Sequence, residues 1–194
     1  CYANTKHPVS QSRDVFIPSS MLISQQELHD IMLNDSTYRT CIKRTDRNMS
    51  FVELNTPPIG NQDPLPSCSS WAIGYCAGSI LKYAQCNNWA ESYRSPSFLF
   101  NQSKTYNTPY NDCKNVTERI TRVLSKYIKL GCCSWDLLPY DTTTCDSSVI
   151  THEMVLDAMM NRVKCTQIAF DNLVVNTLKS YLQHGYPIVV CQAV

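Results

Sequence analysis

The segment 69–85 constrains the fold of this chain more than any other stretch of the sequence. Its apolar residues recur at steps of three and four, which is the spacing of one face of an α-helix. The residues at these steps are Trp71, Ala72, Tyr75, Cys76, Ser79, Ile80 and Tyr83, of which the serine alone is polar. Because apolar character covers most of the circumference, we expect this helix to be largely buried. A chain of 194 residues is long enough to bury it in the core of one domain.

Two further helices are predicted by their start and stop signals. Ser95 followed by Pro96 is typical of a helix start, since proline is tolerated in the first turn. Asn115 with Glu118 three residues later predicts a second start with a box-like cap, and Gly131 predicts the end of that helix. The apolar stripe between these signals consists of Ile120, Val123, Leu124, Tyr127 and Ile128.

The two ends of the chain carry weaker patterns. A capping box at 24–27 predicts a short helix after an irregular start. Residues 150–162 and 171–185 are predicted to be helical, whereas residues 166–170 and 187–194 have the pattern of strands. Because the last predicted strand includes the final residue of the sequence, we expect the native polypeptide to continue or a partner to complete the sheet.

Cysteine content indicates the compartment. Eleven cysteines are more typical of an oxidising compartment than of a reducing cytosol. No CxxC pair is present and the four histidines do not cluster, so neither a metal nor another cofactor is expected. We therefore predict a secreted, luminal or surface-exposed protein, including the surface of a virion. Four N-x-S/T sequons agree with this, and they begin at Asn34, Asn48, Asn101 and Asn115.

Charge and hydropathy exclude two classes of partner. The net charge is +1 and no long basic run occurs, so nucleic acid is not expected. Apolar runs such as residues 188–191 are far too short to span a bilayer. The remaining partner classes are a polypeptide substrate, or a protein that completes the C-terminal part of the fold.

The segment 52–74, VELNTPPIGNQDPLPSCSSWAIG, carries the most specific motif. It resembles the papain-like cysteine peptidases, particularly their bacterial and viral branch, in which V-D-L-R is followed by P-P-V and then by D-Q-G-S-L-G-S-C-T-A-x-A. The match runs through Pro57-Pro58-Ile59, Asn61-Gln62 and Ser67-Cys68 without a gap. The resemblance implies that Cys68 is the nucleophile and that Gln62 contributes to the oxyanion hole.

The spacing also makes chemical sense without the family. A thiolate in the first turn of a helix is stabilised by the macrodipole and by unpaired N–H groups. Gln62, six residues before Cys68, can fold back across the loop. Its side-chain amide and the Cys68 backbone N–H would then form a two-donor oxyanion hole.

The resemblance continues in family order after this motif. Residues 95–101 resemble the family segment S-P-x-x-L-Y, residues 128–140 resemble the stretch that ends in W-P-Y, and residues 182–194 resemble the strand L-x-x-G-x-P-V. It implies an α+β papain-like fold with a cleft between two subdomains. The expected organisation is an N-terminal extension over 1–51, propeptide-like in character, a helical subdomain over 52–140, and the beginning of a β-rich subdomain over 141–194.

Several departures keep a second interpretation open. In an alternative register with a one-residue gap, Ser70 stands at the reactive position and Cys68 is a disulfide cysteine. The family's catalytic His and Asn follow the strand that corresponds to 187–194, so the base would lie beyond Val194. The histidines of this chain are His7, His29, His152 and His184, none at that place. The alternative function is a catalytically inactive papain fold that serves as a disulfide-braced structural or binding component of a secreted or virion-surface assembly.

Overall fold

The computed structural model describes residues 52–107, 112–165 and 174–190. Helices dominate the described part, and one two-stranded antiparallel sheet accompanies them, so the architecture is loosely α+β. The extension over 1–51, the predicted helix after the capping box at 24–27, and the predicted strand at 166–170 lie outside the described residues. No helix of the described residues is both long and apolar enough to cross a membrane.

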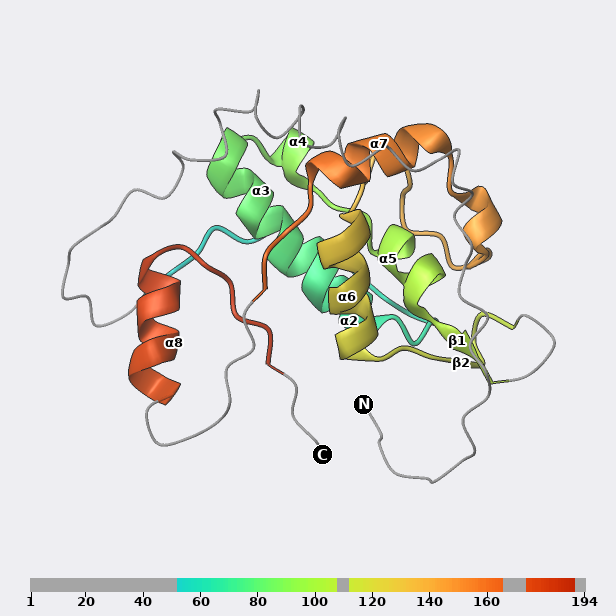
Figure 1. Ribbon diagram of the computed structural model, residues 1–194, viewed down its shortest axis with the longest axis horizontal. Coiled ribbons are helices and arrows are strands. Elements are labelled where there is room, and N and C mark those ends of the chain that lie inside the picture. The colour runs from blue at the N-terminus through green and yellow to red at the C-terminus, as the bar shows by residue number, and fades with distance from the viewer. Residues whose placement is uncertain (1–51, 108–111, 166–173, 191–194) are drawn as a thin grey trace.

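The predicted central helix is present and runs without interruption from Cys68 to Cys86 (Figure 1). It consists of an α-helical turn α2 (Cys68–Ser70), a π-helical segment η3 (Trp71–Gly78) and the α-helix α3 (Ser79–Cys86). Its end is marked by Asn87, which adopts a left-handed conformation with φ of 51°. The π-helical segment in the middle was not predicted, because the spacing of apolar residues does not distinguish an α-helix, with hydrogen bonds between residues four apart, from a π-helix, with hydrogen bonds between residues five apart.

The segments after the central helix fold over it. They comprise α4 (Trp89–Ser92), α5 (Pro96–Ser103), β1 (Thr105–Tyr106), β2 (Val116–Thr117), α6 (Ile120–Leu130), the 3₁₀ turn η4 (Ser147–Val149), α7 (His152–Met160) and α8 (Val174–Gln183). Helices α5 and α6 both pack against α2 and η3, and α7 packs against α6. In Figure 1, α8 stands apart from the other helices.

The predicted start at Ser95 is confirmed in detail. The Ser95 hydroxyl accepts a hydrogen bond from the Phe98 backbone N–H at 3.1 Å, and Pro96 occupies the first turn. The resulting helix α5 is buried along its whole length, with Phe98, Leu99 and Phe100 at most 1 % exposed. Three consecutive buried side chains point to different sides of a helix, so α5 has structure around it on all sides.

The start predicted at Asn115 is wrong by five residues, although the helix itself exists. Val116 and Thr117 instead pair with Tyr106 and Thr105 in the antiparallel sheet β1–β2. Both residues are β-branched, which favours the extended conformation. Helix α6 begins only at Ile120, and Glu118 does not cap it. The stop is confirmed, because Gly131 ends α6 with φ of +83°.

The core has two parts. The larger cluster is formed by Ile73, Phe98, Leu99, Val123, Tyr127, Cys132, Cys133 and Ala158. A smaller cluster of Leu65, Phe100, Val116 and Cys145 lies next to the loop that precedes Cys68. This smaller cluster is tied by a disulfide between Cys113 and Cys145, with a Cα–Cα distance of 5.7 Å. The predicted stripe of α6 faces the larger cluster through Ile120, Val123, Leu124 and Tyr127, whereas Ile128 is 42 % exposed.

The C-terminal part differs from the prediction of a β-rich subdomain. Over 141–165 and 174–190 the described residues form the 3₁₀ turn η4 and the helices α7 and α8, and no strand. Residues 187–190 have no regular structure, although Val189 packs on the larger core cluster. The sequence could not reveal this difference, because an apolar segment that packs on the core has the same hydropathy pattern whether or not it forms a hydrogen-bonded strand. Residues 191–194 lie outside the described residues.

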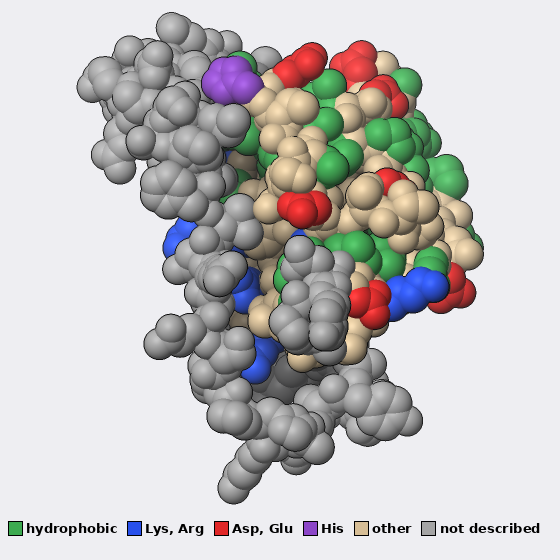
Figure 2. Space-filling view, turned by 90° about the vertical axis from the view of Figure 1, so that its right-hand side faces the viewer, with side chains coloured by type: hydrophobic (Ala, Val, Ile, Leu, Met, Phe, Trp, Pro, Cys, Tyr) green, Lys and Arg blue, Asp and Glu red, His purple; other side chains and the backbone are tan. Residues whose placement is uncertain are grey.

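The surface is mixed in character. Figure 2 shows the side of the molecule that lies at the right of Figure 1, where apolar, acidic and uncharged polar side chains alternate over the described residues. The exposed large apolar side chains include Ile59, which is fully exposed, and Met160, which is 45 % exposed.

The contact between the central helix and α6 gives a testable prediction. A Cβ atom at Gly78 would overlap the Tyr127 hydroxyl, so G78A is expected to destabilise the fold by about 1–3 kcal/mol despite the better helix propensity of alanine. The same substitution should cost less in a Y127F background, which removes the overlapping oxygen. Urea denaturation of the four proteins of this double-mutant cycle measures the difference, and strictly additive free energies would contradict the contact.

Candidate functional site

Cys68 is the first residue of the central helix. Its side chain is half-buried, and it carries a thiol rather than a disulfide. The helix behind it is fixed by the two core clusters, since α2 packs on both α5 and α6. A sulfur atom is thus presented at the positive end of a helix that is well anchored, which is the arrangement that the motif predicts.

The loop before Cys68 is folded back on itself. The Leu65 N–H donates to the Gln62 carbonyl oxygen at 3.2 Å, and the Ser67 N–H donates to the Leu65 carbonyl oxygen at 2.8 Å. Leu65 is buried in the smaller core cluster and anchors this loop. The backbone of Gln62 is therefore held in the folded loop that leads to the helix start.

Tyr140 connects this loop to a distant part of the chain. Its hydroxyl donates to the Gln62 carbonyl oxygen at 2.6 Å and lies 2.7 Å from the Ser67 hydroxyl oxygen. A tyrosine hydroxyl has one proton, so the Ser67 hydroxyl must be the donor in the second bond. Ser67 occupies the N-cap position of the helix but makes no side-chain cap, because its hydroxyl is used in this way.

Glu118 supplies the missing cap from another segment. Its Oε2 accepts the Ser70 backbone N–H at 3.0 Å, and its Oε1 accepts the hydroxyl protons of Ser70 and of Ser103, the latter at 3.1 Å. The backbone of Ser69 also contributes a hydrogen bond. A carboxylate near free amides at a helix start is favourable for both hydrogen-bonding and dipole reasons. Sequence reasoning assigned Glu118 to its own helix and missed this role.

Burial changes the acidity of Glu118. Desolvation raises the pKa of the Glu118 carboxyl above its ordinary value of 4.5, and the hydrogen bonds from Ser70, Ser103 and Ser69 oppose that rise. The raised pKa means that the net effect of the folded environment favours the protonated acid, even though several donors stabilise the carboxylate.

Ser70, the alternative reactive residue, is held in the interior. Its side chain is fully buried and its hydroxyl donates to Glu118. An attacking oxygen needs access to the substrate, and a hydroxyl in this position has none. The geometry therefore gives Ser70 a structural role in the cap, which corrects the alternative register.

A cavity of about 320 Å³ has Gln62 in its wall. It is lined by Thr56, Pro57, Pro58, Ile59, Gly60, Gln62, Trp71, Tyr75, Cys76 and Ile80, and Cys68 does not line it. The Tyr75 hydroxyl donates to the Pro58 carbonyl oxygen at 2.9 Å, which fixes one wall. Gln62 therefore lines the cavity, whereas Cys68 does not.

The aromatic wall of this cavity belongs to a larger aromatic cluster. Trp71 contacts Tyr75, Trp135 and Tyr140 with ring centroids 4.8, 6.1 and 4.9 Å apart. Trp71 and Tyr75 are both 8 % exposed, so their predicted place in the core is confirmed. Tyr140 therefore stabilises the site in two ways, by its hydroxyl and by its ring.

Cys76 is a second thiol on the central helix, and its surroundings differ from those of Cys68. It is exposed at the cavity, and desolvation by the neighbouring groups raises its pKa. A raised pKa leaves less thiolate at neutral pH, so Cys76 does not have the character of an activated nucleophile.

The two histidines in the described residues lie away from the start of the central helix. His152 begins α7, and His184 follows α8 with its Nδ1 2.6 Å from the Ser180 carbonyl oxygen. Figure 1 shows the start of α7 and the end of α8 well separated from α2. His7 and His29 lie outside the described residues. The structure thus brings neither His152 nor His184 to Cys68.

The remaining cysteines and sequons divide into exposed and buried positions. Cys132 and Cys133 are fully buried thiols. Asn101 is 3 % exposed and its side-chain amide donates to the Asp146 carbonyl oxygen, so this sequon is not accessible in the folded chain. Asn115 is exposed, whereas Asn34 and Asn48 lie outside the described residues.

Comparison of the chain with protein-family models, with curated proteins and with solved structures finds no match in any of the three. The roles considered for Cys68 and Gln62 therefore rest on the sequence motif and on the geometry of the helix start.

The hydroxyl of Tyr140 gives a prediction for stability. Y140F keeps the ring in the aromatic cluster but removes the hydroxyl that bonds to both the Gln62 carbonyl oxygen and the buried Ser67 hydroxyl, so a loss of about 1–2 kcal/mol in unfolding free energy is expected. Y186F is the matched control, because Tyr186 is 42 % exposed. Urea denaturation compares the two variants, and equal midpoints would show that the hydroxyl bridge contributes nothing.

The raised pKa of Glu118 gives a prediction for pH dependence. Because the folded state binds this proton more tightly, the contribution of Glu118 to stability is fully present below the ordinary pKa of 4.5 and is lost as the pH rises through the folded pKa. The unfolding free energy of the unaltered protein relative to E118Q should therefore fall over that range.

Asp141 provides the opposite control for this measurement. Hydrogen bonds from Thr144 and Thr143 lower the pKa of Asp141 to about 2 from its ordinary 3.8. Relative to D141N, the unaltered protein should therefore lose stability as the pH falls from about 4 toward 2. Chemical denaturation at a series of pH values measures the stability of the unaltered protein relative to E118Q and relative to D141N. If both differences changed with pH in the same direction, the assigned pKa shifts would be contradicted.

Proposed function

We propose that this chain is part of a papain-like cysteine peptidase in which Cys68 attacks the scissile carbonyl of a polypeptide. The observation that carries the proposal is the half-buried thiol at the first residue of a long anchored helix, preceded by a loop that folds Gln62 back toward the helix start. This is the geometry that a helix-terminal thiolate nucleophile requires.

The chemistry assigned to the site is acyl transfer. The Cys68 sulfur forms a bond to the carbonyl carbon, and the carbonyl oxygen takes up the electron pair as an oxyanion. The Gln62 side-chain amide and the Cys68 N–H are the proposed donors to that oxyanion. As the C–N bond breaks, a general acid protonates the leaving amine, and water then hydrolyses the thioester. The resemblance places this acid–base group, a His oriented by an Asn, beyond Val194.

Contacts between the segments of the resemblance support the proposal. Tyr140, the last residue of the stretch similar to W-P-Y, bonds to the Gln62 carbonyl oxygen and packs on Trp71. The Ser95 N–H, at the start of the segment similar to S-P-x-x-L-Y, donates to the Cys133 carbonyl oxygen at 2.9 Å. Segments in family order thus meet around the helix that begins at Cys68.

The proposed setting is an oxidising compartment, either secreted, luminal or at a cell or virion surface. The Cys113–Cys145 disulfide and the exposed sequon at Asn115 support this proposal. The disulfide braces the smaller core cluster, which includes Leu65 in the loop before Cys68.

A second candidate function is a catalytically inactive papain fold with a structural or binding role. One observation favours it: the carboxylate of Glu118 occupies the amides at the start of the Cys68 helix. A negative charge at this place opposes a thiolate. The cavity beside Gln62, which Cys68 does not line, would suit a binding role.

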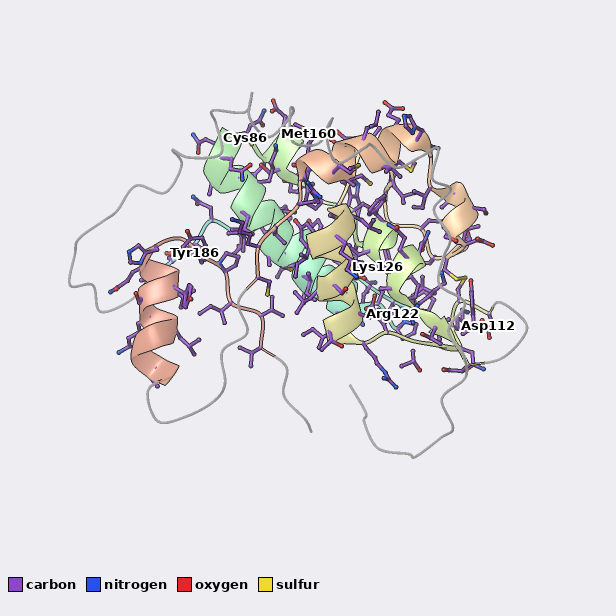
Figure 3. All side chains as sticks on the ribbon, viewed as in Figure 1. Cys86, Asp112, Arg122, Lys126, Met160 and Tyr186 are labelled. Atoms are coloured by element: carbon purple, nitrogen blue, oxygen red, sulfur yellow. A yellow bond between two sulfur atoms is a disulfide. The ribbon has the colours of Figure 1, made fainter. Side chains whose placement is uncertain are left out.

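Alkylation of the native protein separates the two candidates. A low concentration of iodoacetamide should label Cys68 faster than Cys86, which lies at the opposite end of the same helix (Figure 3) where the dipole disfavours an anion. Peptide mapping identifies the labelled thiols. In the full-length protein, C68A should abolish hydrolysis of an unfolded polypeptide, whereas C76A should retain it. Slow labelling of Cys68 together with no hydrolysis would favour the inactive fold.

A further inference from the structure

We propose that Glu118 is a positioning residue for Cys68: its carboxylate fixes the first turn of the helix, and its negative charge restrains formation of the Cys68 thiolate. The proposal rests on the proposed function for the assignment of Cys68 as the reacting group. Its test measures only thiol reactivity, so it does not depend on peptidase activity.

The geometry of the helix start carries this inference. In a free helix N-terminus, the first amides are unpaired and stabilise an anion nearby. Here the Ser70 amide is 3.0 Å from Glu118 Oε2, and Ser69 contributes a further backbone bond. The backbone amides of Ser69 and Ser70, which could stabilise a Cys68 thiolate, are therefore already bound to the Glu118 carboxylate.

Ser103 and Ser70 fix the position of this carboxylate. The Ser103 hydroxyl donates to Oε1 from the end of α5, and the Ser70 hydroxyl donates to the same atom from α2. The carboxylate is thus held by groups from two helices and cannot turn away without breaking several bonds. Its charge stays within the first turn of the helix that begins at Cys68.

The basic groups of the surrounding elements have other partners. On the side of α5, the Lys104 ammonium donates to the carbonyl oxygens of Asn101 and Cys145, and burial lowers the pKa of Lys104 to about 8 although Asp146 and Glu118 both raise it. On the side of α6, the Arg122 guanidinium donates to the Thr105 hydroxyl at 2.7 Å.

Three more charged side chains belong to this neighbourhood. Arg119 directly follows Glu118 and is exposed, and Lys126 lies one turn beyond Arg122 on α6 (Figure 3). Asp146 follows Cys145 and acts electrostatically on Lys104. Arg119 and Lys126 carry the opposite charge to Glu118, and Asp146 carries the same charge, but the resolved influences on the Glu118 carboxyl are its burial and its hydrogen bonds to Ser70, Ser103 and Ser69.

Neutralising Glu118 is therefore expected to increase the thiolate fraction of Cys68. Two charges within one helical turn repel each other, and removal of one favours ionisation of the other. The raised pKa of Glu118 adds a natural route to the same change, because the carboxyl takes up its proton at a higher pH than an ordinary glutamate.

The decisive experiment compares alkylation rates of Cys68 in native E118Q and in the unaltered protein at about pH 7. E118Q removes the charge but keeps the shape and one acceptor, so the rate should rise about threefold or more. S103A is the matched control, because it keeps the charge and removes one bond to the carboxylate. Cys86 serves as an internal reference thiol in each protein.

The outcomes separate this proposal from the proposed function. Acceleration of Cys68 in E118Q but not in S103A supports the charge effect, even if the unaltered protein is inactive as a peptidase. An unchanged or slower rate in E118Q overturns the proposal, and so does equal acceleration in S103A, because loosening of the cap would then explain both.

A measurement on the unaltered protein keeps the test valid if E118Q does not fold. The logarithm of the alkylation rate of an independent thiol rises with a slope of about one per pH unit below its midpoint. If the Glu118 carboxylate restrains Cys68, each rise in pH that removes the Glu118 proton also makes the Cys68 thiolate harder to form. The slope for Cys68 should therefore be less than one over that pH range, while the slope for Cys86 stays at about one. Parallel slopes for the two thiols would overturn the proposal.

Discussion

The bonds between Glu118 and the start of the central helix are the interaction on which the rest of the site depends. One carboxylate links the first turn of that helix to Ser103 at the end of α5. The segment that contains Glu118 comes directly after β2 and leads into α6. A single half-buried acid therefore ties together the elements that surround Cys68, and it replaces the local cap that Ser67 does not provide.

The same interaction explains why the site has two opposing tendencies. A thiol at the start of an anchored helix has the position of a nucleophile, and the folded loop brings Gln62 close to it. The carboxylate that stabilises the helix start also reduces the electrostatic support that such a thiol would receive. The Glu118 carboxylate thus occupies amides that a Cys68 thiolate would otherwise use, and this is why thiol reactivity is measured with and without that charge.

Much of the helical framework could be predicted from the sequence because its signals are local. The apolar period gave the central helix, Ser95 with Pro96 gave the start of α5, and Gly131 gave the end of α6. The prediction failed at Glu118, since an Asn followed by a Glu three residues later is compatible with a capping box or with a strand. Pairing of Val116 with Tyr106, ten positions earlier in the chain, decided in favour of the strand.

The sequence by itself determined that a thiol stands at the start of a buried helix, because periodicity and the N-terminal position of Cys68 are local properties of the chain. Only the tertiary structure decided what surrounds that thiol. Tyr140 reaches the Gln62 carbonyl oxygen across 78 residues, and Glu118 reaches the Ser70 amide across 48. Such hydrogen bonds follow from the packing of separate elements, which no window of neighbouring residues encodes.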